Sequence, residues 1–135
     1  MGKMKILISG NLLVEEDNLA MKILPELKKR FPDIVFREFD PNENLEDLEG
    51  NITILDVAKG IDEVRLIKGL DKIEASEIYS LHDFDLGFNL KLLKKIGRLD
   101  KIRIIAIPYN ISEKQALNQV QLILRKLVAQ LMQGS

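Results

Sequence analysis

The chain of 135 residues contains no cysteine and no tryptophan, and it has a single histidine. The absence of cysteine excludes disulfides, zinc–thiolate sites, iron–sulfur clusters and a cysteine nucleophile, and it is typical of a reducing compartment. An excess of charge of one sign is also missing, because 20 basic and 21 acidic residues are spread along the chain and leave a net charge of −1. We therefore expect no binding to nucleic acid or to an anionic membrane surface.

Long hydrophobic runs and glycine-rich loops are absent as well. No apolar run approaches the roughly 18 residues that a membrane-spanning helix needs. The N-terminus, Met1 to Met4, leads directly into a strand-like segment and does not resemble a signal peptide, so we expect a cytoplasmic protein without membrane insertion. Gly10 is the only glycine between the first predicted strand and its helix, which excludes a P-loop and a dinucleotide fingerprint. No serine lies in a nucleophile-elbow context, which disfavours a Ser-His-Asp hydrolase.

The residues that are present predict one α/β domain over residues 1–135. Hydrophobic residues make up 46% and charged residues 30% of the chain, as in an ordinary globular domain. Apolar runs predict strands at 4–9, 33–39, 52–58 and 102–107, and shorter strands at 64–67 and 77–79. Helical spacing predicts helices at 17–31, 84–96 and 112–132. This alternation indicates a mainly parallel, twisted sheet with helices on both faces, in a single three-layer domain.

Two local signals refine the predicted helices. Pro25 falls inside the first helix and is expected to kink it or to make it restart, because proline lacks the N–H that the helix needs. Ser112 and Gln115 have the spacing of a capping box, in which each side chain bonds the backbone N–H of the other residue. The last helix is therefore expected to begin directly after Ser112.

Polar residues at the ends of the predicted strands are the candidates for a functional site. In open α/β sheets, ligands bind outside the carboxyl ends of the strands, which selects Asn11 to Asp17, Asp40, Asp56 and the loop after Pro108. Asp17 can equally serve as a cap of the first helix. Asp56 ends an apolar run, where a carboxylate is costly without a partner, but a structural partner would suffice.

The histidine, His82, lies just ahead of the predicted helix 84–96, with Asp83 and Asp85 close behind it. It can be a surface histidine, and either aspartate can cap the helix. Taken together with Asp17 and Asp56, however, it completes a set of one imidazole and two carboxylates. Three such donors could form an open site for a divalent transition metal.

Three short stretches, Gly10 to Asp17, Ile54 to Val57 and His82-Asp83, resemble the hydrogenase maturation proteases. These are cytoplasmic endopeptidases that remove a C-terminal extension from the large subunit of nickel–iron hydrogenases after nickel is installed. The resemblance implies a five-stranded twisted sheet between helices. It also implies that Asp17, with Glu16 beside it, joins Asp56 and His82 as metal ligands and catalytic residues. The nickel would be supplied by the bound precursor of the large subunit, and no organic cofactor would be needed.

The implied metal could polarise the scissile carbonyl or activate a water, or it could serve only as a recognition tag. Asp83 and Asp85 are candidates for orienting the imidazole. The chain departs from the family pattern in two places. It has Asn18-Leu19-Ala20 where the family usually has Gly-x-Gly, and Asp40-Pro41-Asn42 where the family usually has Asp-Gly-Gly. These departures favour a first alternative, a docking paralogue that does not cleave. A second alternative is an unrelated α/β binding module whose carboxylates are structural.

Overall fold

The computed structural model describes residues 4–9, 19–39, 50–69, 72, 79–80, 97 and 99–133. Six strands and two helices lie within these ranges. In chain order they are β1 (Lys5–Ser9), α1 (Leu19–Arg30), β2 (Val35–Phe39), β3 (Gly50–Lys59), β4 (Arg65–Lys68), β5 (Tyr79–Ser80), β6 (Leu99–Pro108) and α4 (Glu113–Gln133).

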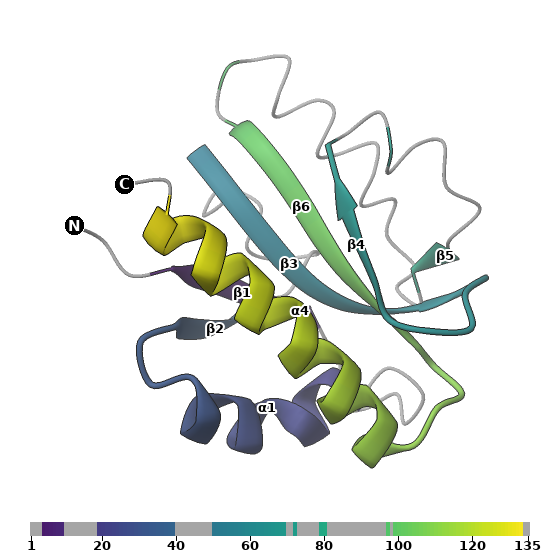
Figure 1. The fold of residues 1–135 in the computed structure, drawn as a ribbon. Helices are drawn as coiled ribbons and strands as arrows, with labels where there is room; N and C mark the ends of the chain where they lie inside the picture. The colour runs from purple at the N-terminus through teal and green to yellow at the C-terminus, as the bar shows by residue number, and fades with distance from the viewer. Residues whose placement is uncertain are drawn as a thin grey trace.

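Five of the strands form one mixed, mostly parallel sheet in the order β2-β1-β3-β6-β4, and the short β5 pairs with β3 off this path (Figure 1). Strands β2, β1, β3 and β6 are parallel, and β4 runs antiparallel to β6 at the edge. The predicted mainly parallel, five-stranded α/β sheet is thus confirmed. The antiparallel direction of β4 was not predicted, because a run as short as Arg65–Lys68 carries no signal of its direction.

Both described helices pack on one face of the sheet. In Figure 1, α4 lies in front of the sheet and crosses its strands. Their buried side chains share a core cluster with every second residue of the central strands, among them Ile8, Leu55, Val57, Ile105 and Ile107. The alternate residues point to the second face, as the period of a strand requires. They are buried too, which explains why β3 and β6 read as continuous apolar runs. The sequence predicted helices on both faces of the sheet. The two described helices confirm this for one face, and for the other face it stays a prediction.

Helix α1 runs without a restart through Pro25, so that part of the prediction is wrong. Pro25 is exposed, while the buried stripe Leu19, Ala20, Ile23, Leu24 and Leu27 is complete on either side of it. The ring therefore costs one backbone hydrogen bond on the solvent side. The packing of the apolar stripe outweighs that loss.

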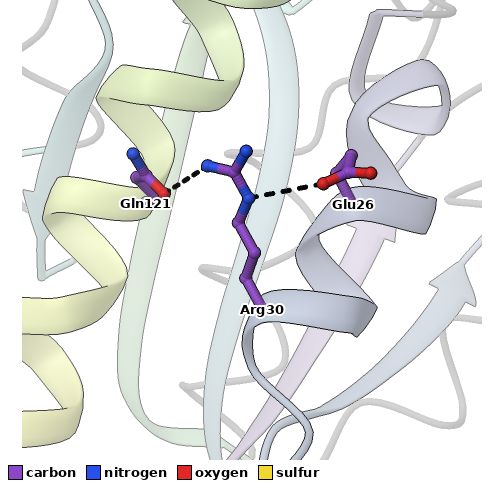
Figure 2. A network of polar contacts seen from close by, with 3 residues as sticks. All are labelled: Glu26, Arg30 and Gln121. Carbon is purple, nitrogen blue, oxygen red and sulfur yellow. Dashed lines mark hydrogen bonds and ion pairs between the residues drawn. The ribbon is translucent and has the colours of Figure 1, made fainter.

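A polar network joins α1 to α4 across their outer surface (Figure 2). The guanidinium of Arg30 donates to Gln121 Oε1 at 2.6 Å and to Glu26 Oε2 at 3.4 Å. The Arg30 and Glu26 side chains are 39% and 48% exposed, so solvent screens the ion pair and its contribution is at most about 1 kcal/mol. The apolar contacts beneath it hold the two helices together.

Helix α4 begins where the capping box predicts. The Gln115 N–H donates to Ser112 Oγ at 3.1 Å, and the Ser112 N–H donates back to Gln115 Oε1 at 3.1 Å. Its buried stripe, Ala116, Val120, Leu124 and Leu127, faces the sheet, whereas Leu131 is 53% exposed. At roughly 1.5 Å per residue, the 21 residues of α4 extend for about 30 Å.

The remaining predicted elements are described only in part. The predicted helix 84–96 lies outside the described residues, and the predicted strand 77–79 is represented by β5. Among the helices described here, none combines the length and the apolar character that crossing a membrane demands.

Candidate functional site

Asp56 is the candidate residue that the structure describes, and it lies deep in the sheet. It belongs to β3, is 3% exposed, and points to the face opposite α1 and α4, as do Ile54 and Ala58. Its register partner on β6 is Ala106, which is also buried. Alanines therefore lie beside the carboxylate on one side along its own strand and across the sheet on β6.

The prediction that Asp56 ends its strand is wrong. Strand β3 continues to Lys59 and stays paired with β6 through Ala58 and Pro108. A carboxylate buried in this aliphatic setting needs polar partners, and the Asp56 side chain has polar interactions of its own in the structure. Asp56 is thus held inside the sheet.

The edge of β3 beside Asp56 is shared by two strands that meet end to end. Strand β1 pairs with β3 up to Ile8 and Leu55, and β1 ends one residue later at Ser9. Farther along, Ala58 pairs with Ser80 of β5 while its other edge is occupied by Pro108 of β6. Because a strand has only two edges, β5 takes the edge that β1 has left. We call this meeting point the β1–β5 junction, defined by Ser9, Asp56, Ala58 and Ser80.

The junction coincides with the position at which the strand order reverses. From β1 the chain passes through α1 to β2, which lies on one side of β1. The later parallel strands, β3 and β6, lie on the other side of β1. In doubly wound sheets the crevice at such a switch point, at the carboxyl ends of the strands, is the usual ligand site. Asp56 lies on β3 at the level where β1 ends, so it is placed for that role.

The loop after Pro108, another predicted site element, also lies at this edge of the sheet. Tyr109 follows β6 directly, and its N–H donates to the Ala58 carbonyl at 3.1 Å. The Lys59 ammonium lies 5.3 Å from the centre of the Tyr109 ring, within cation–π range. In the segment that leads from Lys59 to β4, the Val64 N–H donates to Gln119 Oε1 of α4 at 2.7 Å.

Sequence reasoning missed several of these residues. Ala106 carries no polar signal, and its position opposite Asp56 follows only from the register of two strands far apart in sequence. Lys59 and Gln119 read as ordinary surface residues. The position of Tyr109 directly after a strand-ending proline was a signal that could have been used.

The other predicted site residues lie outside the described residues: Asn11, Glu16, Asp17, Asp40, His82, Asp83 and Asp85. Within the described ranges, no group of three histidine, aspartate or glutamate side chains is close enough to hold a metal ion. The predicted set of Asp17, Asp56 and His82 therefore stays a prediction in which Asp56 alone has a known position.

Comparison with known proteins bears on the fold. No family model and no curated protein matches the sequence. A solved structure, that of the hydrogenase 3 maturation protease, superimposes with a TM-score of 0.53 at 19% sequence identity, covering 87% of this chain and 86% of that chain. The chain thus shares its fold with a hydrogenase maturation protease, as the resemblance of its three short stretches predicted.

Proposed function

We propose that the chain is a cytoplasmic, metal-dependent endopeptidase that removes the C-terminal extension from the precursor of a nickel–iron hydrogenase large subunit. The observation that carries the proposal is the position of Asp56. Its carboxylate is buried at the β1–β5 junction, at the switch point of a fold shared with a hydrogenase maturation protease. A carboxylate buried among aliphatic side chains is held in a fixed position, which suits a metal ligand.

Chain connectivity supports the rest of the ligand set. Asp17 is two residues from Leu19, the first residue of α1, and His82 is two residues from Ser80 of β5. Two residues of chain span at most about 7 Å. Since Ser80 pairs with Ala58, the chain leaves the junction only two residues before His82. Asn11 follows Ser9, the last residue of β1, by two residues in the same way.

The proposed roles follow from the chemistry of the donors. Asp17 and Asp56 offer oxygen and His82 offers nitrogen to the nickel that the precursor carries, and this leaves positions for the precursor's own ligands. The nickel, when bound, supplies a Lewis acid beside the scissile carbonyl. Asp83 or Asp85 would accept the second imidazole N–H and fix the ring. Asn11, Glu16 and Asp40 lie in chain segments that follow β1 and β2, where they would contact the tail of the precursor.

The direct test is cleavage of nickel-loaded precursor, with the intact mass of the large subunit as the readout. We expect a single C-terminal loss with the wild-type protein and none with nickel-free precursor. Asp56→Asn keeps the shape of the side chain but removes its charge, and we expect it to lower the cleavage rate at least 100-fold, as His82→Ala and Asp17→Ala should. Asp33→Asn is the matched control, because Asp33 is an exposed carboxylate just before β2.

The alternatives predict different results in this assay. A docking paralogue would form a stable complex with the precursor and leave its mass unchanged. An unrelated binding module would neither bind nor cleave any precursor. One feature that favoured the docking paralogue is weakened by the structure. Ala20, where the family usually has glycine, is fully buried in the core cluster, so its methyl group does not narrow a surface channel.

A further inference from the structure

An open groove of about 570 Å³ lies at the amino edge of the sheet, opposite to the edge that carries the candidate site. It is formed where β3 and β6 begin, where the antiparallel β4 ends, and where the last turns of α4 pass over them. Its described lining includes Asn51, Lys68, Lys101, Ile102, Arg103 and Leu131. Three of these side chains are cations, and none is acidic.

Two of the cations face each other directly. Lys68 of β4 and Arg103 of β6 are register partners in an antiparallel pair, so their side chains stand on the same face of the sheet. Like charges at opposed positions destabilise a sheet. Among the residues whose side chains the structure describes, the ion pair is that of Arg30 with Glu26, and none involves Lys68, Lys101 or Arg103. The carboxyl end of α4 offers about half a negative charge, against three positive ones.

The groove has a fixed frame. Asn51 Oδ1 accepts a hydrogen bond from the Lys101 N–H at 3.1 Å, which ties the starts of β3 and β6 together. The Gly69 N–H donates to the Ile102 carbonyl at 2.8 Å, and Gly69 has a φ of 91°, which a side chain would strain. With its carbonyl engaged, Asn51 keeps its amide N–H₂ as a further donor. The groove thus presents donors and cations on a pre-formed backbone.

We propose that this groove binds an acidic segment of a protein partner. The charge of the described lining calls for an anion, and Leu131, which is 53% exposed, adds an apolar contact beside the cations. A peptide with spaced carboxylates and an apolar side chain matches both features. A phosphate group matches less well, because phosphate sites use helix N-termini or clustered backbone N–H groups, and the helix end at this groove is a carboxyl end that repels a concentrated negative charge.

The inference goes beyond the proposed function and does not depend on it. It assigns a second contact surface, remote from Asp56, through which a partner could be held while the carboxyl edge of the sheet stays free. If the proposed function holds, the partner is the precursor, and the two surfaces would contact different parts of it.

The test uses the full chain without nickel and a fluorescent peptide of alternating aspartate and leucine, followed by fluorescence anisotropy. The double variant Lys68→Gln/Arg103→Gln should weaken binding at least tenfold, and raising the salt from 0.05 to 0.5 M should weaken wild-type binding in the same direction. The matched control is Lys22→Gln/Lys28→Gln, which removes two exposed cations from α1 and should change the affinity less than twofold. The same peptide with asparagine for aspartate should not bind.

Three results would overturn the inference: no binding of the acidic peptide, equal weakening in the control variant, or tighter binding of pyrophosphate or single-stranded DNA that depends on Lys68 and Arg103. Thermal unfolding followed by circular dichroism checks the variants, and the double variant should be no less stable because it removes a like-charge pair. Asp56→Asn should bind the peptide as the wild type does. A failure of the cleavage assay is therefore separable from a failure of peptide binding.

Discussion

Ala106 lies opposite the candidate carboxylate on the neighbouring strand, and its side chain is small. It is the register partner of Asp56 and is 1% exposed, so a larger side chain here has to take room on the face to which Asp56 points. We expect Ala106→Val to cost about 1–3 kcal/mol of unfolding free energy by overpacking. We also expect it to lower nickel-dependent cleavage at least tenfold, because it crowds the proposed ligand without changing any donor.

The matched control is Ala116→Val on α4, where an equally buried alanine lies in the core on the other face. Urea denaturation should show a comparable loss of stability there, while the cleavage rate stays within twofold of the wild type. Equal loss of cleavage in both variants would mean that the effect of Ala106→Val is one of stability alone.

At the scale of elements, α4 is held to the sheet by its buried stripe more than by its polar contacts. Leu124, at 1% exposure, lies in the core cluster, whereas Leu122 on the same helix is 53% exposed. We expect Leu124→Ala to lower the free energy of unfolding by about 2–5 kcal/mol. Leu122→Ala should change it by no more than about 0.5 kcal/mol. Urea titrations of both variants measure the difference, and similar losses in the two would show that α4 packs on a different face.

At the scale of the whole molecule, one continuous sheet joins the first described strand to the last. Since β3 pairs with both β1 and β6, the two ends of the chain share one core, and we expect a single cooperative unfolding transition. Far-UV circular dichroism reports the helices. With no tryptophan in the chain, the fluorescence of its two tyrosines reports their surroundings. Coincident urea midpoints for the two signals are expected, and midpoints that differ would argue for two independently folding parts.

Much of this architecture could be predicted from the sequence, for identifiable reasons. The cores of β3 and β6 are apolar runs buried on both faces, and the cap of α4 is a local pattern of two residues, so both were predictable without tertiary information. The end of β3, the direction of β4 and the continuity of α1 through Pro25 depend on partners distant in sequence. For the same reason, the chemistry of Asp56 made it a candidate site residue, while its neighbours at the junction, which follow from register, carried no such signal.

The strand order has a consequence for synthesis on the ribosome. Of the described strands β6 is made last, yet it lies between β3 and β4, both of which emerge well before it. Until β6 leaves the exit tunnel, β4 lacks the partner it has in the finished sheet, and one long edge of β3 has no neighbour. Unpaired strand edges of this kind are sites of aggregation. The nascent chain therefore passes through a stage in which the buried strand β3 is half paired, and the synthesis of β6 closes the described sheet.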